Sequence, residues 1–401
     1  MQGMKIPLLV LILALFPAAS SALTLAEAVQ QALERHPNRQ LVEASRHIES
    51  GYRRQADALL GGDPAVSVSA TSDTFGSDYG YEEYVAGVSL PIWLPGQRSA
   101  KAAIAEGFAG LAEAQARQLA WEVSGAVLEK AWAVRIAQTE MKQAMKQWAA
   151  ARALVQDVEH RFEVGELSRN DLLLAQQDLV EAETTYQEAT AALEQARLDW
   201  FNYTGLHELP ADLEAFAGAT PPKAEGHPKL QAIQAAIEVA ASKADDARAQ
   251  RRAAPVVSLF AKRDRGSRHE EYTDSVGVEF SLPLGTRAPS APAIAEAEAE
   301  LTRAESEAAL ARRELDLQEA AADQELARAT HLLQLAEKKY DYAHKRLRLA
   351  KRAFELGEMN LYQLLLARRQ SNQATRDLKL RRLEKARAEA RRQHVLGVIP
   401  Q

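Results

Sequence analysis

The chain has no cysteine among its 401 residues, so it holds no disulfide and no thiolate metal site. Proline (15) and glycine (20) are few enough to leave long stretches without a helix breaker. Charged residues make up 26% of the chain and the formal net charge is −6. The chain therefore lacks the excess of basic residues that is typical of nucleic-acid-binding proteins. After Phe16 no uncharged apolar run is long enough for a membrane-spanning helix.

Motifs for catalysis are missing as well. The sequence contains no Gly-rich phosphate loop, no HExxH and no nucleophile elbow. Its nine histidines are scattered, and no two are four residues apart, the spacing that places two metal ligands on one helix face. We therefore expect neither an enzyme nor a resident metal or cofactor.

The N-terminus reads as a secretory signal peptide over residues 1–22. Lys5 precedes an apolar stretch over residues 6–16, and small residues follow up to Ala22, after which we expect cleavage. The mature chain is then exported. Without a cysteine at the cleavage point it lacks the acceptor of an acylated lipoprotein.

An internal duplication organises the mature chain. His36-Pro37 recurs as His227-Pro228, 191 residues later, and Gly165 and Gly205 recur as Gly357 and Gly397, at an offset of 192. The order of these landmarks is the same in both halves. We therefore predict a first repeat over residues 23–216, a linker over residues 217–226 and a second repeat over residues 227–401.

Each repeat is predicted to contain a long helical hairpin. Residues 97–164 and 292–356 have almost no internal Gly or Pro and are rich in good helix formers. Their apolar residues recur every seven positions, from Ile294 to Ala350 in the second repeat, which is typical of a coiled-coil seam. The segments RFEVGELSRNDLLLA (161–175) and RAFELGEMNLYQLLLA (352–367) are the turns. Gly165 and Gly357 can end one helix in the left-handed conformation, while Ser168, Asn170 and Asn360 can cap the next.

Four segments alternate with a period of two and are predicted strands: residues 65–71, 84–90, 256–262 and 275–282. With their ends each reaches about ten residues, the length of a tilted strand that crosses an outer membrane. Aromatic residues near the strand ends fit interfacial girdles; they are Tyr79, Tyr81, Tyr84 and Trp93. Four strands leave open edges, so several copies must contribute to one barrel, and three copies would give twelve strands.

These features together resemble the outer-membrane efflux protein family, the TolC-like channel subunits of bacterial export systems. The resemblance rests on LTLAEAVQQALERHPNRQLVEA (23–44), on SLPIW and SLPL after the strand pairs, and on the two Gly-centred turns. It implies a mainly helical fold with a small β part, in which a homotrimer forms a twelve-stranded outer-membrane β-barrel continuous with a periplasmic α-helical tunnel. It also implies a passive duct that receives substrate from an inner-membrane pump of the RND type through a periplasmic adaptor.

The resemblance places adaptor docking at the two turns. The implied contact residues are Val164, Gly165, Glu166, Leu167, Ser168, Leu356, Gly357, Glu358, Met359 and Asn360. Some relatives carry a ring of aspartates just after the inner turn. This chain departs from that pattern, since Tyr362 and Gln363 stand there and the only matching acid is Asp171 in the first repeat. Tyr362 and Gln363 are therefore the candidate gate.

Two other readings stay open at this stage. A periplasmic adaptor would have one hairpin flanked by β-rich domains, whereas a soluble coiled-coil scaffold would not enter a membrane. The cargo is undetermined by the sequence, although the short chain without insertions favours heavy-metal cations over drugs or other small molecules.

Overall fold

The fold is mainly helical with one small sheet, as a computed structural model shows for residues 23–218, 226–284 and 287–400. The first half contains α1 (Leu25–Arg35), α2 (Arg39–Asp57), β1 (Ala65–Ser72), β2 (Glu82–Pro91), α3 (Gln97–Glu163) and α4 (Arg169–Thr204). The second half contains η1 (Ala215–Gly218), α5 (Pro228–Ala249), β3 (Val256–Arg265), β4 (Thr273–Ser281), α6 (Arg287–Glu355) and α7 (Leu361–Val395). The order helix, strand pair, long helix, returning helix therefore occurs twice. The expected signal peptide with its cleavage point, and most of the expected linker, lie outside the described residues.

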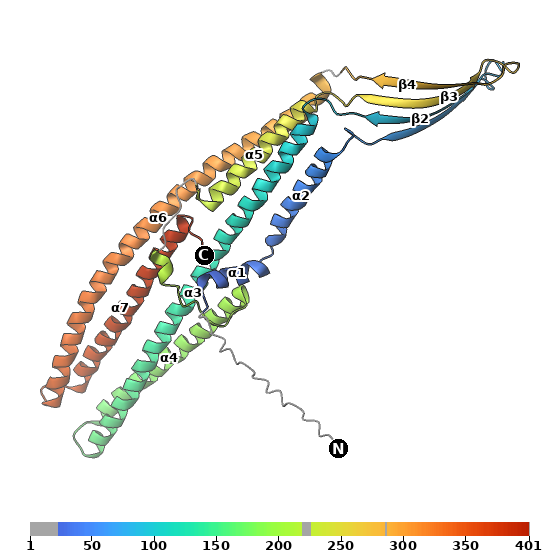
Figure 1. Cartoon of the computed structure of the whole chain (residues 1–401). Helices are drawn as coiled ribbons and strands as arrows, with labels where there is room; N and C mark the ends of the chain where they lie inside the picture. The colour runs from blue at the N-terminus through green and yellow to red at the C-terminus, as the bar shows by residue number, and fades with distance from the viewer. Residues whose placement is uncertain (1–22, 219–225, 285–286, 401) are drawn as a thin grey trace, which may run out of the picture.

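The molecule is strongly elongated, with the sheet at one end and both hairpin turns at the other (Figure 1). α3 has 67 residues and α6 has 69, so each extends over roughly 100 Å at the rise of an α-helix. Alanine and leucine of the predicted seven-residue series are buried along α6, which packs on α5 and α7; they are Leu315, Ala322, Ala329, Ala336 and Ala350. Small side chains at this seam let the two backbones approach closely.

The start of α6 differs from the prediction. The helix begins at Arg287 rather than at residue 292, so Pro292 lies inside it. Pro292 is the sixth residue of the helix, beyond the first four N–H groups that have no acceptor, so its ring removes one backbone hydrogen bond near the start of α6. Pro292 therefore did not mark the first residue of the helix.

The shorter helices fill the space between the two long ones. α5 packs between α3 and α6 in the half of the molecule near the sheet, and α7 packs between the same two helices in the other half (Figure 1). α2 and α4 both pack on α3. The main core lies where these layers meet α1, around the buried Trp132 and Trp200.

The end of α7 meets the start of α5 in a cluster that we call the helix joint: Trp121, His227 and His394. The Trp121 indole N–H donates to the His394 carbonyl at 2.7 Å, and His394 Nε2–H donates to the Trp121 carbonyl at 2.8 Å. The His227 ring meets the same indole edge-on, with centroids 4.9 Å apart. The joint ties the second repeat to the middle of α3.

The sheet is antiparallel with the strand order β1-β2-β3-β4. Its central pair joins the two repeats, and Val88 stands opposite Leu259 there. Every residue of β1 is exposed on both faces, and β4 is exposed at all but one residue. Within the described chain the outer edges of β1 and β4 have no strand partner. The four predicted strands are therefore confirmed as one open sheet, whose edge backbone groups need another partner.

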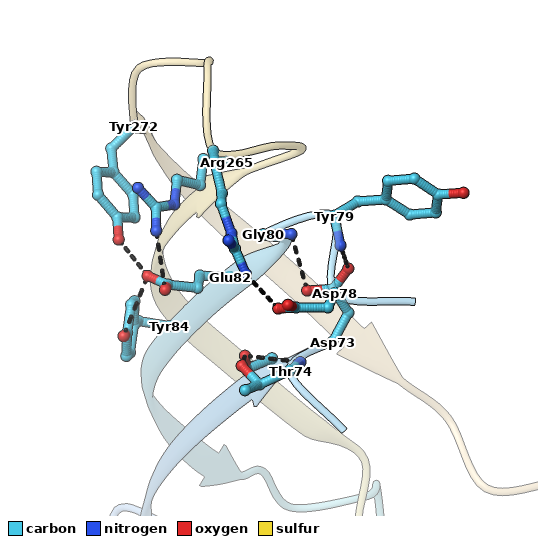
Figure 2. A network of polar contacts seen from close by, with 11 residues as sticks. Asp73, Thr74, Asp78, Tyr79, Gly80, Glu82, Tyr84, Arg265 and Tyr272 are labelled. Atoms are coloured by element: carbon cyan, nitrogen blue, oxygen red, sulfur yellow. Dashed lines mark hydrogen bonds and ion pairs between the residues drawn. The ribbon is translucent and has the colours of Figure 1, made fainter. Parts of the chain in front are cut away.

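Two loops at the far end of the sheet interlock, and we call their contacts the loop clasp (Figure 2). Its members are Asp78, Gly80, Glu82, Arg265, Arg268 and Tyr272. Glu82 accepts hydrogen bonds from the Arg265 guanidinium at 2.9 Å and from the Tyr272 hydroxyl. Arg268 pairs with Asp78, and its backbone N–H donates to the Tyr79 carbonyl at 3.1 Å. These contacts join the β1–β2 loop of the first repeat to the β3–β4 loop of the second.

Asp73 shapes the β1–β2 loop from within (Figure 2). Its carboxylate accepts the backbone N–H groups of Tyr79 at 2.7 Å and of Gly80 at 3.1 Å. Desolvation alone would raise the pKa of Asp73, but hydrogen bonds from Ser77 and from these backbone groups lower it below its ordinary value. The loop is therefore folded by its own polar contacts.

Candidate functional site

Both hairpin turns begin with the same helix-ending motif. Gly165 and Gly357 adopt φ values of +82° and +75°, as predicted from their glycine. In the first turn the N–H of Glu166 reaches back to the Arg161 carbonyl at 2.9 Å, and in the second Glu358 N–H reaches the Ala353 carbonyl at 2.8 Å. This Schellman pattern satisfies carbonyls that the helix end would leave unpaired.

The helices after the turns begin with side-chain caps. The Ser168 hydroxyl accepts the Asp171 N–H, and the Asp171 carboxylate accepts the Ser168 N–H in return, which is a capping box. Asn360 Oδ1 accepts the Gln363 N–H at 2.9 Å. Ser168 and Asn360 are thus the caps that the sequence predicts, whereas the prediction for Asn170 was wrong. Asn170 lies one residue inside α4, which begins at Arg169.

The two turns share one apolar core, which we call the turn core. It takes buried side chains from both hairpins: Val155, Val158, Ala175, Ala350, Leu361, Leu364, Leu365 and Ala367. Leu167 and Met359, which occupy matching places in the two turns, are half-buried and pack against it. The structure therefore brings the two predicted contact segments, 192 residues apart in sequence, to one end of the molecule.

Polar contacts also tie the hairpins to each other near the turns. Arg369 of α7 bonds Asp178 at 2.9 Å and Glu181 at 2.6 Å, both on α4. The Arg161 guanidinium lies over the Phe354 ring, 5.5 Å from its centroid. These pairs hold the second hairpin against the first. No local sequence pattern predicts them, because the partners lie on different helices.

The outward surface of each turn has the same composition. Val164 is 58% exposed and Leu356 is 63% exposed, and each is followed, after the glycine, by an exposed glutamate, Glu166 or Glu358. An exposed large apolar side chain beside a carboxylate can receive a partner that offers apolar contact and positive charge. The two turns therefore present two small exposed surfaces of similar composition at one end of the molecule.

The candidate gate residues lie in the first turn of α7. Tyr362 and Gln363 are both exposed, and they lie between the buried Leu361 and the buried Leu364. The matching acid of the first repeat, Asp171, is engaged in its capping box. That Tyr362 and Gln363 narrow a tunnel stays a prediction, and it concerns the assembled protein.

In the part of the chain that the structure describes, no three His, Asp or Glu side chains lie close enough together to bind a metal ion. Two of the nine histidines instead belong to the helix joint, which the sequence analysis missed. Burial lowers the pKa of His227 and of His394 below the ordinary value, so both rings are held neutral. The recurrence of His36-Pro37 as His227-Pro228 was the sequence signal that pointed to His227. It does not indicate that His227 contacts Trp121.

Hydrophobic membrane-spanning helices are likewise not found among the described residues, where no helix combines the required length with the required apolarity.

Comparison with known proteins gives a consistent set of similarities. The family model for outer membrane efflux protein matches residues 28–206. The cobalt-zinc-cadmium resistance protein CzcC of Cupriavidus metallidurans is 28% identical over 212 residues, which is 50% of this chain and 50% of that protein. The match thus spans about half the length of this curated relative.

Two solved structures share the fold over nearly the whole chain. The outer membrane protein VceC of Vibrio cholerae has a TM-score of 0.70 at 16% identity, covering 93% of this chain and 96% of that one. A membrane protein of Pseudomonas aeruginosa has a TM-score of 0.72 at 16% identity, covering 93% of each chain. The open sheet and the paired hairpins therefore belong to a fold seen in outer-membrane proteins.

Proposed function

We propose that this chain, which belongs to the outer membrane efflux protein family, is the outer-membrane channel subunit of a tripartite export system. In this role it conducts substrate passively, from an inner-membrane pump and a periplasmic adaptor to the exterior. It performs no chemistry on the substrate. The pump is proposed to be of the RND type.

The open sheet is the observation that carries the proposal. Four antiparallel strands with two unpaired edges are not stable by themselves in the hydrocarbon of a membrane. Each backbone N–H or C=O group left without a hydrogen bond there costs roughly several kcal/mol of free energy. Three copies would supply twelve strands and close the barrel. Members of this family form trimeric outer-membrane channels. The long helices would then extend the conduit roughly 100 Å into the periplasm.

The turns are proposed to be where the adaptor docks. They lie at the end opposite the sheet (Figure 1), and their apolar and acidic side chains are exposed. The proposed contacts are those of the first turn, residues 164–168, and of the second turn, residues 356–360. Tyr362 and Gln363, next to the second turn, are proposed to line the constriction.

Heavy-metal cations are the proposed cargo. The support is the relative whose name is cobalt-zinc-cadmium resistance protein CzcC, at 28% identity over half of each chain. A periplasmic adaptor or a soluble scaffold is a weaker alternative, because neither needs a four-stranded sheet with exposed residues on both faces.

Replacing the turn glutamates tests the proposal. In a strain that lacks the chromosomal copy, the double variant Glu166→Arg with Glu358→Arg should lose export while its amount in the outer membrane is unchanged. The matched control, Glu183→Arg, changes an exposed glutamate of α4 away from the turns and should export normally. Export is read as resistance to zinc, cobalt and cadmium, alongside dyes and antibiotics. Normal export by the double variant would refute docking at the turns. Absence of the unmodified protein from the outer-membrane fraction would refute the channel function itself.

A further inference from the structure

The two faces of the sheet differ in chemistry. Because successive residues of a strand point to opposite faces, the strand register sorts the side chains into two sets. One set, which we call the apolar face, includes Val66, Val68, Val88, Leu259, Val276 and Val278. The other set, the polar face, includes Ser67, Ser69, Ser89, Ser258, Lys262 and Ser275. In a membrane barrel an apolar face meets lipid and a polar face lines the lumen.

The exposure of the two central strands agrees with this assignment. On the apolar face Val88 is 41% exposed and Leu259 is 50% exposed. On the polar face Ser89 and Ser258 are half-buried, and their hydroxyl oxygens lie 3.0 Å apart. Side chains crowd together on the concave side of a curved sheet and spread apart on its convex side. The difference therefore fits a polar face that is the inner side of the barrel wall.

Phe260 departs from the chemistry of the polar face. It is the only aromatic residue of that face among the strand residues that the structure describes. It stands opposite Gly87 on β2 and opposite Gly277 on β4, a pair that we call the glycine cradle. A large apolar side chain on the lumenal side is thus flanked, on both neighbouring strands, by residues without a side chain.

The Phe260 ring lies flat on Gly277. A Cβ at Gly277 would overlap Cζ of the ring and would lie 2.9 Å from both Cε1 and Cε2, so it would stand over the face of the ring. On the other side, a Cβ at Gly87 would lie 3.1 Å from Phe260 Cβ and 3.5 Å from Ser67 Oγ. Alanine at both positions would therefore displace the ring from the wall. The space left for the ring is then above the polar face.

We propose that Phe260 forms an apolar band inside the barrel, and that the glycine cradle keeps the bore wide by letting the ring lie flat on the wall. Three copies would place three such rings at one level of the lumen. Upright rings would form a hydrophobic constriction, which opposes the passage of hydrated ions by dewetting. The inference rests on the proposed channel function, because a lumen exists only in the closed barrel. It adds a residue that determines which cargo passes the barrel.

Cysteine reporters can measure the bore, because the chain has no thiol of its own. Ser281 pairs with Val256, four residues from Phe260 along β3, which is roughly 13 Å towards the helices. Ser275 pairs with Lys262, on the loop side of Phe260. Both serines are exposed on the polar face. A reagent too long for other pores can reach Ser281→Cys from outside the cell only by passing the level of Phe260.

The experiment treats intact cells with maleimide–polyethylene glycol reagents of increasing length and records the longest reagent that labels each reporter. The cradle variant, Gly87→Ala with Gly277→Ala, should shift this limit for Ser281→Cys to shorter reagents, because its displaced rings narrow the bore. Adding Phe260→Ala to the cradle variant should remove the shift. The control reporter, Ser275→Cys, should keep its limit in all backgrounds, because reagents reach it before they reach the ring.

Three results would overturn the proposal. They are an unchanged limit in the cradle variant, a shift that persists after Phe260→Ala, and a Ser275→Cys reporter that no reagent labels. Metal resistance of cells with Ser281→Cys and an intact cradle reports the channel function separately. Normal resistance without the expected shift refutes only the role of Phe260, whereas a protein absent from the outer membrane refutes the channel.

Discussion

The Trp121 indole and the His394 imidazole stack face to face, with ring centroids 4.8 Å apart and planes 1° apart. They come from helices 273 residues apart in sequence and exchange hydrogen bonds with each other's backbone carbonyls. His227 completes the cluster at the point where α7 ends and α5 begins. The helix joint therefore holds the two repeats together in the middle of the molecule.

Acid should weaken the helix joint. Because burial lowers the pKa of His394 and His227 in the folded chain, the unfolded chain takes up protons first as the pH falls. The stability contributed by neutral imidazoles is thus present above the ordinary histidine pKa of about 6.5 and is lost as the pH falls through it towards the lower folded values. Melting curves followed by circular dichroism between about pH 8 and about pH 5 should show this loss in the unmodified protein. The His394→Gln variant should be less stable at neutral pH but less sensitive to acid, and parallel curves for the two proteins would contradict the prediction.

Glycine at position 125 is predicted to be required by the joint. A Cβ there would lie 2.5 Å from the His394 ring, so Gly125→Ala should lower the melting temperature although alanine favours a helix. Gly110 is a matched control on the same helix, because a Cβ there meets nothing within 4 Å. Gly110→Ala should stabilise the chain by about 0.5–1 kcal/mol. Equal effects of the two substitutions would show that the His394 contact is not close.

The turn glycines offer a test that separates the turn's conformation from its surface. Gly165→Ala and Gly357→Ala meet open space, so their cost is the left-handed backbone alone, about 1–2 kcal/mol each. Asparagine tolerates this conformation better, so Gly165→Asn should recover much of the stability. Thermal unfolding of the purified oligomer measures the difference. If alanine and asparagine were equally destabilising, a lost contact rather than the positive φ would be the cause.

The loop clasp should protect the far end of the sheet from proteases. A Cβ on Gly80 would lie 2.1 Å from Cγ of Arg268, so Gly80→Ala should push the two loops apart and break the pairing of Arg268 with Asp78. Trypsin added to intact cells should then cleave after Arg268 faster than in the unmodified protein. Gly76→Ala, in the same loop but with its nearest neighbour at 3.7 Å, is the control and should cleave at the original rate. Resistance of the Gly80→Ala variant would mean that the clasp does not order the loops.

Local pattern determined a large part of this fold. The seven-residue series predicted the long hairpins, the period of two predicted all four strands, and Gly165 and Gly357 predicted both turns, because each of these depends on neighbours within one or two helical turns or one strand. The same reasoning erred where a local signal was ambiguous. Pro292 did not begin α6, and Asn170 was not a cap because Ser168 and Asp171 already formed the capping box.

The sequence by itself determined the duplication, the open four-stranded sheet and the exposed turns, and hence the need for further copies. Only the tertiary structure decided that Arg369 pairs with Asp178 of the other hairpin and that Trp121 contacts both His227 and His394. It likewise decided that Arg268 pairs with Asp78 in the loop clasp. These contacts join residues far apart in the chain. Their partners are selected by the packing of whole helices and strands, which no short stretch of sequence encodes.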